Sequence, residues 1–138
     1  MNIDCMDADS IEVYGGIFKS LQDAEDFMKV VNGKPERFYN ELYLGGDFNG
    51  HIMIKFFDKK TNKAEELYKD FPFGDVIVKG LQDKFANKLK RKVNTAIVIY
   101  DFYLLSHFTD RPYSVMREKK TDEFYIFDVE SISPYKTN

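Results

Sequence analysis

The chain has 138 residues and a formal net charge of -3, and it contains 13 Phe and 9 Tyr but only 2 His, 1 Cys and no Trp. A chain of this length fits one domain, whose core is large enough to be stable without a disulfide or a metal. Catalysis at neutral pH usually draws on His, Cys or clustered metal ligands. The composition therefore favours binding, and we expect no enzyme activity, no cofactor and no metal.

The first ten residues, MNIDCMDADS, lack the basic start and the apolar run of a secretion signal. The lone Cys5 cannot form an internal disulfide, which fits a reducing compartment. The longest aliphatic run, residues 96–99, is far shorter than the roughly 20 residues that span a bilayer. We expect a cytoplasmic protein without membrane contact, one domain over residues 1–138, with flexible ends at 1–10 and 131–138.

The first part of the chain predicts a strand followed by two helices. Residues 11–18 read as a strand with a glycine pair at its centre, and Ser20 then caps a helix. Apolar residues at spacings of three and four extend that helix to Val31, before Asn32 and Gly33 end it. Pro35 suits the first position of a second, short helix.

The middle of the chain repeats this order. A turn cluster at 45–50 leads into an alternating strand over 51–58, and a helix capped by Thr61 or Asn62 follows. Asp75 caps the next helix, in which apolar residues at helical spacing continue to Val93. The opposite side of that helix carries the cations of residues 79–92.

Residues 95–102, TAIVIYDF, are the strongest strand signal, and their nearly continuous apolar character suits a central strand covered on both faces. Residues 113–118 and 123–129 predict two more strands joined by a turn at 119–122. The order β-α-α-β-α-α-β-β-β predicts an α+β fold: a mixed, mostly antiparallel sheet of about five strands with helices packed against it.

Two weak motifs point to other functions. Asp47, Asn49 and Asp58 match part of a calcium loop, but Ile52 occupies the position where such a loop needs Gly. His51 and His107 each have an Asp nearby, yet the usual catalytic and metal-binding spacings are absent. A turn with a strand, and ordinary histidines, explain these residues better than a metal site or a hydrolase.

The basic cluster of Lys88, Lys90, Arg91 and Lys92 supports an alternative function. A basic helix over 79–92 would hold phosphates by releasing counterions, as in a nucleic-acid-binding or regulatory module. Cations near a helix C-terminus also complement the helix dipole without binding anything. No recognised nucleic-acid motif accompanies the cluster, so nucleic acid is the less favoured partner.

The aromatic residues divide into two groups. Periodicity places most phenylalanines inward: Phe27, Phe38, Phe56, Phe85, Phe102, Phe124 and Phe127. Tyr103 and Tyr113 lie with Asp101 and Asp110 in a stretch that we expect at the surface. Tyrosines beside carboxylates are common anchors of protein interfaces.

Several segments in order resemble one protein family: IEVYGGIFKS before an acidic helix, GGDFNGHIMIKFF, KAEELYKDFPFGDVIVKGL and NTAIVIYDFYL. Over residues 11–129 the chain resembles the immunity protein 22 family of bacterial polymorphic toxin and contact-dependent inhibition systems. The resemblance implies an immunity protein that binds the C-terminal domain of its cognate toxin and blocks it stoichiometrically, without catalysis.

The charge of the chain bears on the partner. An acidic surface speeds encounter with a basic one, and nucleases are commonly basic because they hold polyanions. We therefore expect the toxin to be a basic nuclease. The candidate toxin-binding residues are Asp47, Asp101, Tyr103, Asp110, Tyr113, Asp122 and Glu123.

Overall fold

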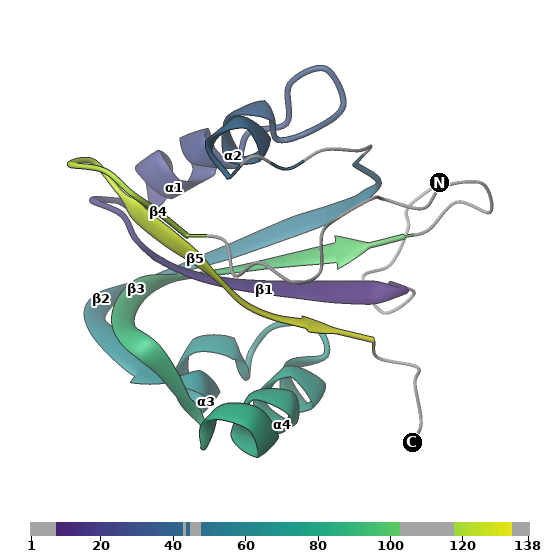
Figure 1. The fold of residues 1–138 in the computed structure, drawn as a ribbon, viewed down its shortest axis with the longest axis vertical. Coiled ribbons are helices and arrows are strands. Elements are labelled where there is room, and N and C mark those ends of the chain that lie inside the picture. Colours follow the sequence, from purple (N-terminus) through teal and green to yellow (C-terminus); the bar gives the residue numbers. More distant parts are fainter. Residues whose placement is uncertain (1–7, 43, 45–47, 103–117, 134–138) are drawn as a thin grey trace.

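The structure, a computed structural model, describes residues 8–42, 44, 48–102 and 118–133. Its elements follow the predicted order (Figure 1). They are β1 (Ser10–Ile17), α1 (Leu21–Phe27), α2 (Glu36–Glu41), β2 (Gly50–Lys63), α3 (Ala64–Tyr68), α4 (Gly74–Phe85), β3 (Lys88–Asp101), β4 (Glu118–Lys120) and β5 (Tyr125–Ile132).

The strands form one five-stranded sheet in the order β2-β3-β1-β5-β4, and all neighbouring strands are antiparallel. Helices α1 and α2 cover one face of the sheet, and α3 and α4 cover the other (Figure 1). The predicted α+β class is confirmed. The central position of TAIVIYDF is confirmed too, since β3 lies between β2 and β1 and residues 95–101 are buried.

Each face of the sheet has its own core. Side chains alternate between the two faces along a strand, so Val13 of β1 faces α3 and α4 whereas Tyr14 faces α1 and α2. We call the two sides the α1–α2 layer and the α3–α4 layer. Because both faces of β1 and β3 are covered, these strands contain almost continuous apolar residues.

Helix α1 begins as predicted and ends earlier. The Ser20 hydroxyl accepts a hydrogen bond from the backbone N–H of Asp23 at 3.1 Å, which confirms the cap. The predicted extension to Val31 is wrong, because the helix ends at Phe27. Asn32 and Gly33 have φ values of 54° and 85° in a tight turn that pairs Val31 with Lys34. An Asn-Gly pair favours such a turn, which reverses the chain.

The predicted starts of the next helices are confirmed only in part. Pro35 directly precedes α2. Thr61 and Asn62, predicted as caps, lie inside β2, which continues to Lys63. Asp75 lies in the first turn of α4, one residue after its start at Gly74.

The predicted helix to Val93 is wrong, since α4 ends at Phe85 and Lys88 begins β3. Ala86 and Asn87 have φ values of 52° and 64°, which end the helix. Leu89 and Val93 are both buried, and residues four apart share a face in a strand as well as in a helix. The cations of residues 88–92 therefore lie on a strand, and the basic helix 79–92 does not exist.

Strand β3 leaves β1 at Asn94. The Asn94 side chain continues the ladder for one more residue, because its oxygen accepts from the Phe18 N–H at 3.0 Å and its nitrogen donates to the Phe18 carbonyl at 2.9 Å. In the part of β3 that precedes Asn94, β3 and its neighbour β2 bend together toward α3 and α4 (Figure 1). The sheet therefore curls, and Lys90 of β3 forms an ion pair with Glu118 of β4, the strand at the opposite margin.

The β4–β5 hairpin turns two residues later than predicted. The Thr121 N–H donates to the Phe124 carbonyl at 2.8 Å across the turn, while residues 113–117 lie outside the described part. β5 continues through Ile132, which pairs with Ile11. Ala8 and Ser10 are buried. Residues 10 and 131–132, which we expected in flexible ends, thus belong to strands β1 and β5.

Candidate protein-binding site

The predicted binding residues do not form one patch in the described part of the chain. Asp47, Tyr103, Asp110 and Tyr113 lie outside the described residues. Asp101 ends β3 opposite Ser10, and it is 8% exposed, so its predicted surface position is wrong. Strands on both sides of β3 bury this residue.

Asp122 and Glu123 are exposed in the β4–β5 turn, as a binding site requires. This turn lies at the Ile17 end of β1, whereas Asp101 lies at the Ser10 end. Seven residue steps at about 3.3 Å separate the two ends by roughly 23 Å. The structure therefore brings Asp122 and Glu123 together and leaves Asp101 apart from them.

Glu123 borders a hollow of ≈ 280 Å³ on the α1–α2 layer. Its lining comes from the end of β1, both helices and the hairpin turn. The lining residues are Phe18, Lys19, Asp23, Asp26, Phe27, Arg37, Glu123 and Phe124. We call this feature the turn hollow.

Three buried rings form the floor of the turn hollow. The ring centroids of Phe18 and Phe27 are 5.6 Å apart, those of Phe27 and Phe124 are 4.6 Å apart, and Phe18 stacks on Phe124 at 5.8 Å. Periodicity correctly predicted Phe27 and Phe124 to be core residues. Rings at such distances pack favourably beyond the area that they bury, so the floor is a fixed apolar surface.

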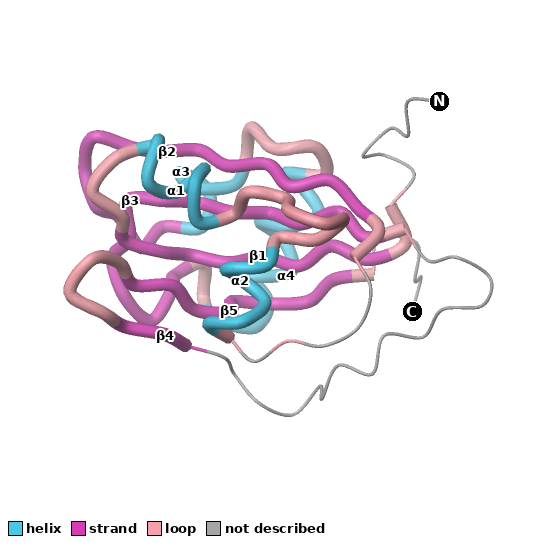
Figure 2. The backbone as a smooth tube through the Cα atoms, turned by 90° about the horizontal axis from the view of Figure 1, so that it is seen from above, coloured by secondary structure: helices cyan, strands magenta, loops and turns pink. Residues whose placement is uncertain are grey.

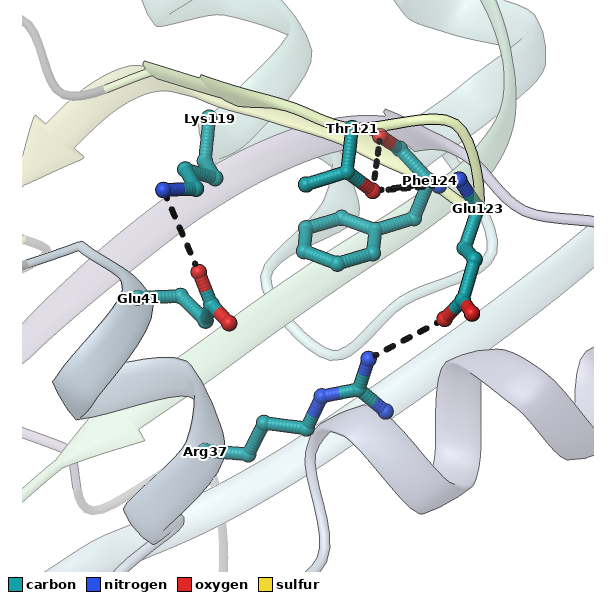
Figure 3. A network of polar contacts seen from close by, with 6 residues as sticks. All are labelled: Arg37, Glu41, Lys119, Thr121, Glu123 and Phe124. Carbon is teal, nitrogen blue, oxygen red and sulfur yellow. Dashed lines mark hydrogen bonds and ion pairs between the residues drawn. The ribbon is translucent and has the colours of Figure 1, made fainter.

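Arg37 of α2 lies over this floor. Its guanidinium carbon is 5.2 Å from the centre of the Phe27 ring and 5.4 Å from that of Phe124. Its Nη2 is 3.6 Å from Oε2 of Glu123 (Figure 3). Such exposed ion pairs contribute only about 0–1 kcal/mol, and the ring faces add cation–π attraction. The turn hollow thus already holds one guanidinium between rings and a carboxylate.

The backbone beside the turn hollow is held in place from two sides (Figure 3). The Thr121 hydroxyl accepts from the N–H groups of Glu123 and Phe124, both at 3.1 Å. Lys119 of β4 pairs with Glu41 of α2 at 3.4 Å. These contacts fix the turn relative to α2, so the position of Glu123 is set before any partner binds.

The far rim of the turn hollow is acidic. Asp23 and Asp26 are exposed on α1, and Asp26 accepts a hydrogen bond from Gln22 at 2.8 Å. Two cations and three carboxylates line the hollow, which gives 2 - 3, a net charge of -1. An apolar floor with an acidic rim is suited to holding the cation of a Lys or Arg side chain.

Sequence reasoning missed Phe18, Asp23, Asp26 and Arg37 as site residues. The acidic start of α1 was explained by the helix dipole, and nothing near Arg37 in the sequence links it to Glu123. These residues meet only because β5 pairs with β1 and α2 packs beside that pair. No local signal could have found this contact.

A second charge network connects β3 to the hairpin on the α3–α4 layer. The Tyr125 hydroxyl donates to Glu118 at 2.8 Å, and Lys90 donates to the same carboxylate oxygen. The hydrogen bond from Lys90 is the largest cause that lowers the pKa of Glu118. Burial, with the nearby Glu118 carboxylate, raises the pKa of Tyr125 to about 12.

The same network engages two of the cations that suggested nucleic-acid binding. The Lys90 ammonium also lies 4.8 Å from the centre of the Phe127 ring, and the Arg91 guanidinium lies 5.8 Å from that of Tyr125. These contacts hold the bent part of β3 against β5. Lys90 and Arg91 therefore have a structural role.

Comparison with known proteins adds no family or relative. No protein-family model matches the chain, and neither a curated protein nor a solved structure matches it. The resemblance to immunity proteins therefore stays a prediction. Within the described residues, no group of His, Cys, Asp and Glu is arranged to hold a metal. Within the same residues, no helix is long and apolar enough to cross a membrane.

Proposed function

We propose that this chain is an immunity protein that binds a basic toxin domain, a nuclease by preference, and blocks it stoichiometrically. The turn hollow is the observation that carries the proposal. It offers a rim of Asp23, Asp26 and Glu123 above a floor of rings, and a basic side chain of the partner fits that chemistry. The net charge of -3 adds attraction toward a basic protein at longer range.

Arg37 indicates how a partner cation binds. Its guanidinium lies over two rings and beside Glu123, while Asp26 stands on the opposite rim and accepts a hydrogen bond from Gln22. A toxin Arg or Lys that enters between Arg37 and α1 meets the Asp23 and Asp26 carboxylates over the same floor. The contact removes that cation from the phosphate-binding surface of a nuclease, which accounts for inhibition.

The fixed frame of the site supports tight binding. The Thr121 hydrogen bonds and the Lys119–Glu41 pair order the turn in the free protein. A partner therefore loses little free energy to ordering the turn when it binds. Charged rims act mainly on association and on its salt dependence, so we expect binding to weaken as salt rises.

The test reverses the charge of the rim. Asp26→Lys with Glu123→Lys places two cations at the turn hollow, and both residues are exposed, so the fold is retained. Cells that express the toxin domain encoded beside this gene are expected to lose protection, and the purified toxin domain is expected to bind at least ten-fold more weakly. Growth and calorimetric titration measure the two effects.

A matched control is Glu65→Lys with Asp83→Lys, which makes the same charge change on the α3–α4 layer. It changes long-range attraction equally and leaves the rim intact, so protection is expected to persist. Equal loss in both double variants would move the binding site away from the turn hollow. If the wild-type protein bound no neighbouring toxin domain, the proposed function itself would fail.

A further inference from the structure

Strand β2 has an open edge. It pairs with β3 on one side, and within the described residues no strand pairs with its other side. Figure 2 shows β2 along one margin of the sheet and β4 along the other. From Gly50 to Phe56 the register with β3 is regular, without a bulge. Long, regular and apolar edge strands are templates for pairing with another strand.

The hydrogen-bond pattern between β2 and β3 shows which residues of β2 have backbone groups on the open side. The Phe102 N–H donates to the Asn49 carbonyl at 2.8 Å, so residues 49 and 102 form a hydrogen-bonded pair. Such pairs alternate along antiparallel strands. The odd-numbered residues of β2 therefore bond to β3, and Gly50, Ile52, Ile54 and Phe56 direct their backbone groups to the open side.

A groove with both polar and apolar lining residues runs beside this edge, and Glu25 and His51 are among the polar ones. It has a volume of ≈ 330 Å³, and its apolar lining includes Met28, Val30, Ile52 and Ile54. Val30 is 48% exposed, the highest fraction among the exposed large hydrophobic residues in the described part. An unpaired strand edge thus lies beside a groove that contains exposed apolar side chains.

We propose that this edge pairs with the same edge of a second copy of the chain, antiparallel, about a two-fold axis at Met53. That axis is the centre of the regular segment 50–56. It places Ile52 opposite Ile54 of the second copy and Gly50 opposite its Phe56. The pairing joins the two sheets into one continuous sheet and covers both grooves.

A second copy fits this edge because the edge is self-complementary. With the axis at Met53, outward-facing residues meet outward-facing residues, so every free N–H in the segment finds a carbonyl. Lys55 faces His51 of the second copy and lies away from Lys55 of that copy, so the two ammonium groups are not opposed. A two-fold axis matches identical surfaces in this way by symmetry.

Cysteine cross-linking tests the register. In a Cys5→Ser background, Met53→Cys places two thiols on a pair without hydrogen bonds, whose Cα atoms are about 4.5 Å apart and within reach of a disulfide. Mild oxidation is expected to convert most of this variant to a covalent dimer. Lys55→Cys is the matched control, because its copies are four residue steps, roughly 13 Å, apart along the strands. Equal cross-linking of the two variants, or none in either, would overturn the proposal.

A second variant tests the hydrogen bonds of the edge. Ile54→Pro removes an outward N–H and leaves the β2–β3 ladder intact, as proline does on edge strands. Sedimentation equilibrium is expected to give a dimer for the wild type and a monomer for this variant, with an unchanged circular dichroism spectrum. If Ile54→Pro does not fold, the cross-linking of Met53→Cys and Lys55→Cys still tests the proposal. A wild type that is monomeric until the toxin domain is added would assign the edge to the toxin and overturn the proposal.

Discussion

The two helical layers cover the same sheet with different side chains. In the α1–α2 layer six of the twelve buried core residues are aromatic, and the helices have only 7 and 6 residues. The α3–α4 layer has a larger, mainly aliphatic core and the 12-residue helix α4. Rings bury much area per residue, so short helices suffice to close the α1–α2 core.

The two layers also differ in the hollows on their surfaces. The turn hollow and the groove beside β2 both open on the α1–α2 layer. The hollow on the other layer, along α3 and α4, is bordered by long side chains such as Lys69, Lys79 and Gln82, together with Val78. The comparison teaches that the layer with the aromatic core is also the one where carboxylates and an unpaired strand edge border the hollows.

The largest effect is expected from removing the ring at the centre of the α1–α2 layer. Phe27 is fully buried, and its ring lies near those of Phe18, Phe38 and Phe124. Phe27→Ala is expected to lower the free energy of unfolding by about 3–5 kcal/mol. Leu81→Ala in the α3–α4 layer is the comparison, with about 2–5 kcal/mol.

Urea unfolding of the purified variants measures both values. Phe27→Ala also removes part of the floor of the turn hollow, so toxin binding is expected to weaken in that variant and to persist in Leu81→Ala. A loss below about 1 kcal/mol for Phe27→Ala would mean that the rings contribute little to this core.

A medium effect is expected where the two layers are connected. The Tyr68 hydroxyl, on α3, donates at 3.0 Å to the carbonyl of Tyr14, whose ring packs in the α1–α2 layer. Tyr68→Phe removes this buried hydrogen bond and is expected to cost about 0.5–1.5 kcal/mol. Thermal unfolding measures it. Burial raises the pKa of Tyr68, so absorbance is expected to show that this tyrosine ionises only when the protein unfolds.

The smallest effect is expected at the Glu118 network and appears as a change with pH. The pKa of Glu118 lies below its ordinary value of 4.5 in the folded protein. Its contribution to stability is therefore present above pH 4.5 and is lost as the pH falls through the folded pKa. We expect the denaturant midpoint of Glu118→Gln to change less with pH on this acid side than that of the wild type. Chemical unfolding at several pH values measures the midpoints.

At alkaline pH the stability changes in the opposite direction and falls as the pH rises. Tyr125 has its pKa raised from 10.0 to about 12, so its contribution is present below pH 10 and is lost as the pH rises toward 12. Tyr125→Phe is expected to remove this alkaline loss and to leave the acid side less changed. An acid profile identical in wild type and Glu118→Gln would show that the carboxylate does not stabilise the fold.

The sequence by itself determined the order and type of the elements. The Ser20 cap, Pro35 before α2 and the apolar run of β3 are local signals, because they express backbone preferences and side-chain periodicity. The end of α4 was mispredicted because a spacing of four, as between Leu89 and Val93, fits both a helix and a strand. Local pattern alone does not separate the two there.

Only the tertiary structure decided where the candidate binding surfaces lie. Asp101 looked exposed until its neighbours β1 and β2 buried it, and Arg37 meets Glu123 from a position 86 residues away, 123 - 37, on another element. Which residues share a surface depends on strand order and on the packing of helices against the sheet. Those choices come from the total area buried and the hydrogen bonds satisfied across the whole chain, which no short segment encodes.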